Sequence, residues 1–407
     1  MKKIVTFILF SVINFSIFSQ NSESKILQFK YHQNDNYQFN SVVEEEVKMN
    51  GRLLNHATIV NRSTISVSKV DENGRGYEKA NFMTSEIFNG YPTWSENFES
   101  EYWRSRDGKF EIADSYIMPV VRDVPIFSEK PVKIGDTWTA DGYEAEDMRK
   151  LFGIPNPVKV PFTATYTYLR DEERISSDSK HEKRNLQVIQ VNYSINYENP
   201  QAANSYTETL DSIMGFSNKT IWWDNEKGQI DHFDENFRII ITSLRGNVLM
   251  FTGTSKSEVT EFKRTASEAV VQQVQSKVDQ LGIKDVSVKK SENGLTLSLE
   301  KIQFEPNSSN LLESEQAKLD KIAEILSGFP NDLLIEGHTA RSGSEESCQI
   351  LSEERANSVA DYLVGKGTRK KNQIFTTGKG SRIPIMSNDT PEGMARNRRV
   401  EITILDK

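Results

Sequence analysis

The spacing of the hydrophobic residues changes along the chain, and this change constrains the fold more than any other feature. Over residues 24–255 apolar and polar residues alternate, as in residues 158–169 (VKVPFTATYTYL) and residues 188–197 (VIQVNYSINY). Alternation with a period of two places the apolar side chains on one face of a strand. Turn sequences separate the runs at residues 71–74 (DENG), 106–109 (RDGK) and 225–228 (NEKG). We therefore expect antiparallel hairpins that form one large β-rich domain, or two smaller ones.

From residue 263 the apolar residues recur at steps of three and four, which is the pattern of an amphipathic helix. The residues that carry this pattern are Ala266, Ala269, Val270, Val274, Val278 and Leu281. Predicted strands and helices then alternate to the end of the chain, which indicates βαβ units on one sheet. The strands are expected at residues 285–290, 295–304, 333–338, 373–378 and 398–405, and the helices at residues 315–327 and 347–365.

The predicted fold class is therefore α+β with several domains. An N-terminal antiparallel β-rich domain covers residues 24–255, and a helix and a strand at residues 256–291 link it to the rest. A C-terminal domain of order β/α/β/α/β-β covers residues 292–407. A chain of 407 residues has room for two or three such domains.

The first twenty residues have the pattern of a secretory signal peptide. Lys2 and Lys3 precede an apolar run from Ile4 to Phe18, which Ser19 and Gln20 close. The alternative is an uncleaved anchor, but the run is shorter than the roughly 20 residues that span a bilayer. No cysteine lies near this segment for lipid attachment, and the single cysteine of the chain leaves no intrachain disulfide. We expect an exported protein from which residues 1–20 are removed.

Charge and strand composition limit the classes of partner and the environment that we expect for this protein. The net charge of −8, with basic residues interleaved among acidic ones, argues against binding to nucleic acid. Lipid-facing strands need uninterrupted apolar residues on one face, whereas residues 41–49 (SVVEEEVKM) contain three consecutive glutamates. A soluble periplasmic β domain is therefore favoured over a membrane barrel.

Four stretches near the C-terminus resemble a known family in their order and spacing. They are residues 302–311 (IQFEPNSSNL), 335–344 (IEGHTARSGS), 351–367 (LSEERANSVADYLVGKG) and 378–402 (GKGSRIPIMSNDTPEGMARNRRVEI). Together they are similar to the OmpA-like peptidoglycan-binding domain, and four motifs in register are stronger evidence of fold than any one of them. The N-terminal β-rich region resembles no family that we can name.

The resemblance implies a site for the diamino acid of the peptidoglycan stem peptide. Arg355 matches the arginine that holds the carboxylate of this ligand, and a guanidinium can do so through two parallel hydrogen bonds. The family places an aspartate for the ammonium after Thr339, and this chain has Ala340 there. An asparagine of the family corresponds to Cys348. Each lost hydrogen bond to a charged group costs about 1.5 to 3 kcal/mol, so affinity is expected to be weakened or lost. Glu345 and Glu346 of the same loop are candidates to compensate.

Three more residues belong to this predicted site. Phe304 and Leu351 would supply the apolar rim of the groove, and Arg398 would shape it by bonding loop backbone. Each has a plainer reading: Phe304 and Leu351 as core residues, Arg398 as a surface arginine, and Arg355 as the partner of Glu353 or another acid. His338 is expected to be a hydrogen-bonding structural residue.

The sequence offers no catalytic constellation. The five histidines lack the spacing of a metal site, and Cys348 has no base that the sequence reveals. We therefore expect no enzyme, no metal and no cofactor. Two hypotheses remain: a periplasmic envelope protein that docks on or near peptidoglycan while its β domain meets other envelope proteins or the outer membrane, or a degenerate domain that serves structure or protein contacts alone.

Overall fold

The computed structural model describes residues 23–88, 91–175, 183–202, 207–261, 267–291, 293–305 and 308–406. The signal peptide predicted for residues 1–20 lies outside the described residues. Within these ranges, no helix has the length and apolar character needed to cross a membrane.

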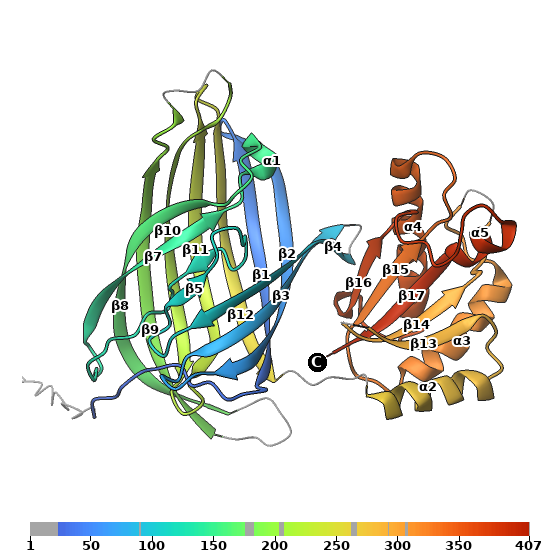
Figure 1. Cartoon of the computed structure of the whole chain (residues 1–407), viewed down its shortest axis with the longest axis horizontal. Coiled ribbons are helices and arrows are strands. Elements are labelled where there is room, and N and C mark those ends of the chain that lie inside the picture. Colours follow the sequence, from blue (N-terminus) through green and yellow to red (C-terminus); the bar gives the residue numbers. More distant parts are fainter. Residues whose placement is uncertain are drawn as a thin grey trace, which may run out of the picture.

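The N-terminal part of the chain is a single curved antiparallel sheet. Its strands are β1 (Asn36–Met49), β2 (Arg52–Val70), β3 (Gly76–Phe88), β4 (Tyr91–Arg104), β5 (Phe110–Ile112), β6 (Val121–Arg122), β7 (Thr137–Glu146), β8 (Val158–Ile175), β9 (Lys183–Glu198), β10 (Leu210–Asp224), β11 (Gln229–Ser243) and β12 (Val248–Glu261), with a short helix α1 (Arg149–Phe152). They pair in the order β5-β4-β3-β2-β1-β12-β11-β10-β9-β8-β7-β6. Figure 1 shows them as a tall curved wall with β5 on its inner side. The predicted antiparallel hairpins are confirmed, since all three turn sequences lie between paired strands.

The alternation of apolar and polar residues along β8 shows how this sequence places a core on one face of the sheet. Val160, Phe162, Ala164 and Tyr166 are buried, whereas the residues between them are exposed. The buried face contributes to a core of aromatic and branched side chains. At its centre the fully buried ring of Trp223 lies 4.8 Å from that of Phe29 and 4.5 Å from that of Phe127, measured between centroids.

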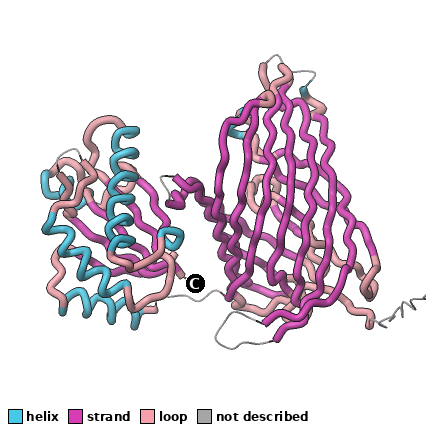
Figure 2. Tube along the Cα trace, turned by 180° about the vertical axis from the view of Figure 1, so that it is seen from behind, coloured by secondary structure: helices cyan, strands magenta, loops and turns pink. Residues whose placement is uncertain are grey.

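The C-terminal part has helices on one face of a second sheet. Its elements are α2 (Glu268–Gln280), β13 (Val286–Ser291), β14 (Gly294–Glu300), α3 (Glu313–Leu326), β15 (Leu333–His338), α4 (Glu345–Gly365), the 3-10 turn η2 (Lys371–Gln373), β16 (Ile374–Gly378), α5 (Pro391–Asn397) and β17 (Arg399–Leu405). The strand order is β13-β14-β17-β15-β16, with β15 and β16 parallel. Figure 2 shows the helices gathered over one side of this sheet, as the predicted βαβ units require.

Two details differ from the sequence prediction. The strand expected to reach residue 304 ends at Glu300, because Lys301 has a φ of 57° and turns the backbone out of the sheet. The helix and strand expected to act as a linker pack into the C-terminal core instead. Val274 and Val278 of α2 join the same cluster as the buried residues of α3 and α4, and β13 pairs with β14 along its length.

The β3–β4 hairpin reaches from the N-terminal sheet to the edge of the C-terminal one (Figure 2). Strand β4 pairs in parallel with β16 at one position, where Thr93 lies opposite Thr376, so the hairpin meets the edge of that sheet. The hydroxyl of Tyr91 donates to the carboxylate of Asp361 at 2.6 Å, and the rings of Trp94 and Phe375 lie 5.5 Å apart. These contacts join segments nearly 300 residues apart, and no pattern in the sequence predicted them.

Candidate functional site

The loop between β15 and α4 holds Thr339 and Ala340 of the predicted site, and a glycine sets its position. A Cβ atom on Gly337 would lie 2.0 Å from the carbonyl oxygen of Ser352, so α4 packs against β15 more closely than any other residue would allow. Helix α4 begins after Ser344, whose hydroxyl accepts a hydrogen bond from the backbone N–H of Ser347 at 3.1 Å. The loop of residues 339–344 is therefore fixed at both ends.

Ala340 and Cys348, the two residues predicted from the resemblance to depart from the family pattern, lie against each other. Both are buried. The thiol of Cys348 donates to the carbonyl of Ser342 at 3.1 Å, and its sulfur lies 3.8 Å from the carbonyl oxygen of Ala340. Residue 348 therefore supports the backbone of the loop, while residue 340 offers no side-chain acceptor for an ammonium group.

The neighbours of Ala340 show what remains at this end of the site. The backbone N–H of Thr339 donates to Gly380 at 2.9 Å, but its hydroxyl is buried and has no hydrogen-bond partner among the described residues. Glu345, a candidate to compensate for the missing carboxylate, lies 3.6 Å from the guanidinium of Arg382. Glu345 is thus engaged with a cation of the protein itself.

Arg355 lies at the other end of the site, half-buried on α4. Its guanidinium carbon is 4.7 Å from the centre of the Phe304 ring, and its Nε donates to the carbonyl of Ser308 at 3.4 Å. Within the described part of the chain Arg355 forms no ion pair, and Glu353 instead accepts a hydrogen bond from Gln349 at 2.6 Å. Pairing of Arg355 with Glu353, the plainer reading from the sequence, is therefore not what the structure shows.

The charge around Arg355 favours an anion. Burial lowers the pKa of Arg355, and the nearby positive charge of Arg398 lowers it further, while Glu354 acts in the opposite direction. Two cations close enough to repel each other, with no carboxylate bonded to either among the described residues, form a local excess of positive charge. A bound carboxylate or phosphate group would relieve that repulsion.

Helix α4 connects the two ends of the site. Cys348, Leu351 and Arg355 are separated by three and four residues, which places them on one face of the helix. Leu351 is half-buried between the other two. Phe304 therefore contacts Arg355, and the positive charge of Arg398 acts on Arg355. Helix α4 connects this end of the site to the loop that contains Ala340.

Arg398 itself differs from its predicted role. Its side chain is exposed, and the guanidinium that bonds loop backbone belongs to Arg399, which donates to the carbonyl of Ile383 at 3.1 Å. The reason is that β17 begins at Arg399, whose buried side chain also donates to Glu401 at 2.8 Å, whereas Arg398 lies just outside the strand. The loop-bonding role therefore belongs to the second arginine of the pair.

Sequence reasoning missed two further residues that build the site. Gln349 donates to the carbonyl of Gly378 at 2.8 Å and so ties α4 to the end of β16. Its spacing of four from Glu353 on a predicted helix was a usable signal. Ser308 supplies the carbonyl that positions Arg355, and a backbone acceptor in a loop leaves no signal in the sequence.

His338 also departs from its prediction as a hydrogen-bonding residue. Both ring nitrogens are buried and have no hydrogen-bond partner among the described residues. Burial lowers the pKa of His338 to about 3, with the positive charges of Arg399 and Lys379 acting in the same direction and Glu401 opposing them.

This depressed pKa predicts that acid destabilises the fold through His338. The unfolded chain takes up a proton as the pH falls below about 6.5, whereas the folded protein resists it until about pH 3, so stability decreases as the pH falls between these values. The slope is at most about 1.4 kcal/mol per pH unit. Replacing His338 with leucine should flatten the dependence of melting temperature on pH between pH 7 and 5. The same change at exposed His56 should leave that dependence intact; equal curves for the two variants would contradict the assignment.

Comparison with known proteins identifies this part of the chain. Residues 303–398 match the model of the OmpA family. Peptidoglycan-binding protein ArfA of Mycobacterium tuberculosis is 42% identical over 104 residues, which are 25% of this chain and 32% of that protein. Outer membrane protein A of Bordetella avium is 44% identical over 103 residues, which are 25% of this chain and 53% of that protein.

A solved structure gives a similar match. An outer membrane protein from Borrelia burgdorferi is 41% identical, with 30% of this chain and 96% of that chain covered and a TM-score of 0.25. The chain spans about a third to a half of the length of the two curated relatives named above. The matched residues contain all seven residues of the predicted site. The chain therefore carries an OmpA family domain at residues 303–398, and the part before it is not assigned to a family.

Proposed function

We propose that this protein is a noncatalytic component of the cell envelope whose OmpA domain binds peptidoglycan through a half-site centred on Arg355. The observation that carries the proposal is the half-buried guanidinium of Arg355, which lies beside Arg398 and has no carboxylate partner among the described residues. A relative of this domain is named as a peptidoglycan-binding protein, which supports the same ligand class. The proposed location is the periplasm, at the cell wall or the outer membrane.

The half-site holds the ligand by one end. The planar guanidinium of Arg355 can donate two parallel hydrogen bonds to a stem-peptide carboxylate, in a position where partial burial strengthens them. Phe304 and Leu351 border that position with apolar surface. The ammonium end of the diamino acid meets Ala340, so it gains no charged hydrogen bond. A diaminopimelate stem, which brings an extra carboxylate, suits this site better than an ornithine stem.

The division of the chain is part of the same proposal. The β-rich region of residues 24–255 would engage another envelope component, and residues 292–407, with α2 and β13 of the expected linking segment (residues 256–291) packed against them, would meet the cell wall. Retention of the purified protein on insoluble peptidoglycan tests the wall-binding step directly. A folded protein that is not retained even at low salt would contradict it.

Restoring the missing carboxylate should strengthen binding. Replacing Ala340 with aspartate supplies one charged acceptor for the ammonium group, and we expect affinity for peptidoglycan to rise about tenfold. Sedimentation with peptidoglycan at several protein concentrations measures the change. Ser342→Asp adds the same charge at an exposed position of the same loop and should leave affinity within about twofold of the parent. Equal gains in both variants would attribute the effect to net charge.

A second candidate function is a structural or protein-interaction module without ligand. Two observations favour it: the thiol of Cys348 packs under the Ala340 loop, and β4 pairs with the free edge of β16. On this hypothesis Ala340→Asp gives no gain, and loss of Arg355 changes nothing in the peptidoglycan assay. The pair of variants therefore separates the two functions.

A further inference from the structure

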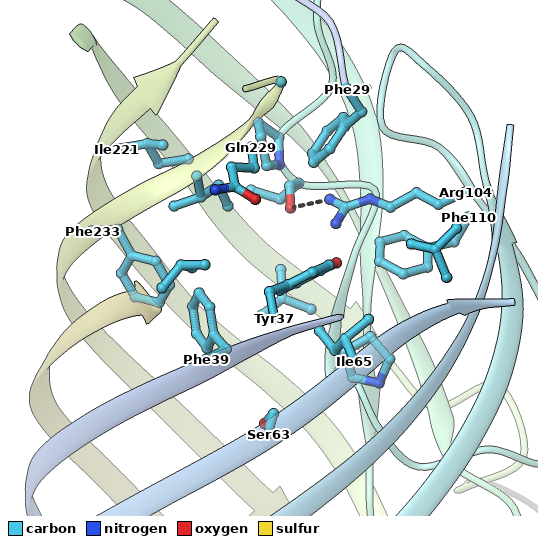
Figure 3. Close-up of a pocket in the computed structure, with 18 of the residues that line it drawn as sticks. Phe29, Tyr37, Phe39, Ser63, Ile65, Arg104, Phe110, Ile221, Gln229 and Phe233 are labelled. Atoms are coloured by element: carbon cyan, nitrogen blue, oxygen red, sulfur yellow. Dashed lines mark hydrogen bonds between the residues drawn. The ribbon is translucent and has the colours of Figure 1, made fainter. Parts of the chain in front are cut away.

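The inner side of the N-terminal sheet encloses a cavity that the proposed wall-binding function does not use. Its volume is about 600 Å³, within the range of about 300 to 1,000 Å³ that is usual for small-molecule sites. Its walls come from β1, β2, β10 and β11 and from the segments around residues 29–31 and 104–125. Figure 3 shows Tyr37, Phe39, Ile221 and Phe233 around one space, with Arg104 pointing into it.

Apolar side chains make most of the wall. They include Phe39, Ile65, Phe82, Phe110, Ile221 and Phe233. They come from strands far apart in the sheet, so the curvature of the sheet is what brings them around a common space. A surface of this kind binds hydrocarbon, because the burial of each CH₂ group contributes about 0.8 kcal/mol.

Arg104 is the exception on this wall. It is buried, and its guanidinium carbon lies 4.0 Å from the centre of the Phe29 ring and 4.5 Å from that of Phe110. Nε donates to the carbonyl of Gly108 at 3.2 Å, and Nη2 donates to that of Val124 at 3.4 Å. No carboxylate lies within ion-pair distance of Arg104 among the described residues. Buried charges are normally paired, so this one has a place for an anion.

A buried acid, Glu78, acts electrostatically on Arg104 but forms no ion pair with it among the described residues. Glu78 is fully buried behind the cavity wall and accepts a hydrogen bond from the hydroxyl of Tyr37 at 2.6 Å. Burial raises the pKa of Glu78, and the positive charge of Arg104 acts in the opposite direction. The other buried cation on the wall, Lys219, lies 3.3 Å from the carboxylate of Glu235 and is already paired.

We propose that this cavity binds an anionic amphiphile with a single hydrocarbon chain, whose chain lies along the aromatic wall and whose carboxylate or phosphate group bonds to Arg104. A guanidinium suits either anion through paired hydrogen bonds. Among the described residues, Arg104 is the buried cation of the wall that has no ion pair, and the volume is typical of one small ligand; together these features favour one charged group and one chain. The N-terminal sheet is then a lipid-type binding module attached to a domain that meets the cell wall.

Ligand comparison with the unaltered full chain tests this without any mutation. Displacement of a fluorescent fatty acid is measured with oleate, with oleoyl lysophosphatidylglycerol and with oleyl alcohol, each below its critical micelle concentration. We expect displacement by at least one of the two anionic ligands, and the stronger of them shows whether the natural group is a carboxylate or a phosphate. Oleyl alcohol, which has the same chain and no charge, should bind at least about tenfold more weakly.

Two variants test whether Arg104 supplies the positive charge that binds the anionic group of the ligand. Arg104→Met should weaken the preferred anionic ligand at least about tenfold and leave oleyl alcohol unchanged. Arg52→Gln removes one positive charge from an exposed residue outside the cavity wall and should change affinity less than about twofold. No displacement by either anionic ligand, or equal affinity for oleate and oleyl alcohol in the unaltered protein, would overturn the proposal even if Arg104→Met fails to fold.

Discussion

Replacing Arg355 with alanine is expected to reduce affinity for peptidoglycan by about tenfold to a hundredfold. This range corresponds to one hydrogen-bonded charged contact of about 1.5 to 3 kcal/mol. Arg355 is the cation of the proposed half-site. Among the described residues no carboxylate forms an ion pair with it, so its guanidinium can bond to a carboxylate of the ligand. Arg355→Lys keeps the charge but not the planar pair of donors, so its affinity should fall between those of the parent and the alanine variant.

A matched control separates this local effect from a change in net charge. Arg245→Ala removes one positive charge from an exposed side chain of the N-terminal sheet, where Arg245 lies 3.2 Å from Glu208. Its retention on peptidoglycan should equal that of the parent. Circular dichroism should show all three variants to be folded. If Arg355→Ala and Arg245→Ala bind alike, the half-site is not the contact, and the module hypothesis takes its place.

The second large effect concerns Gly337, which lies two residues before Thr339. A methyl group at this position would lie 2.0 Å from the backbone oxygen of Ser352, and a backbone atom of a packed helix cannot move away alone. Gly337→Ala should therefore push α4 away from β15 and cost about 3 kcal/mol or more in the free energy of unfolding. Because α4 also positions Arg355 and Cys348, peptidoglycan binding should be lost together with stability.

Gly365→Ala is the comparison for this variant. Gly365 is the last residue of α4, and a Cβ atom there would meet no other atom within 4 Å. The substitution should leave stability unchanged or raise it by a fraction of about 1 kcal/mol, since alanine favours helix. Thermal unfolding followed by circular dichroism measures both. A Gly337→Ala protein as stable as Gly365→Ala would show that β15 and α4 can separate at little cost.

Much of the fold could be predicted from the sequence, because the residues that share a face according to the hydrophobic period are also the residues that are buried. In β8 the residues predicted to share a face are the ones buried in the core, and in α4 Ala356, Val359, Ala360 and Leu363 are buried as their spacing indicated. Local patterns of this kind need no knowledge of distant segments. The OmpA family was likewise recognisable from four stretches in order, because each is a short run of residues whose pattern does not depend on distant contacts.

The candidate site was predicted less completely, for a physical reason. Which arginine of the pair at residues 398 and 399 bonds the loop depends on where β17 begins, and strand boundaries are set by pairing with β14 and β15. Packing also decides that His338 and the hydroxyl of Thr339 have no hydrogen-bond partner in the described part of the chain, and that the carbonyl of Ser308 lies beside Arg355.

By itself the sequence determined the β-rich start, the helical change of period near residue 263 and the OmpA family of the last part, and it predicted the loss of an aspartate at Ala340. Only the tertiary structure decided the rest: the pairing of β4 with β16, the absence of an ion pair at Arg355 within the described chain, and the cavity around Arg104. These features depend on contacts between residues that are distant in the chain, whereas hydrophobic periodicity reports only which way neighbouring side chains face.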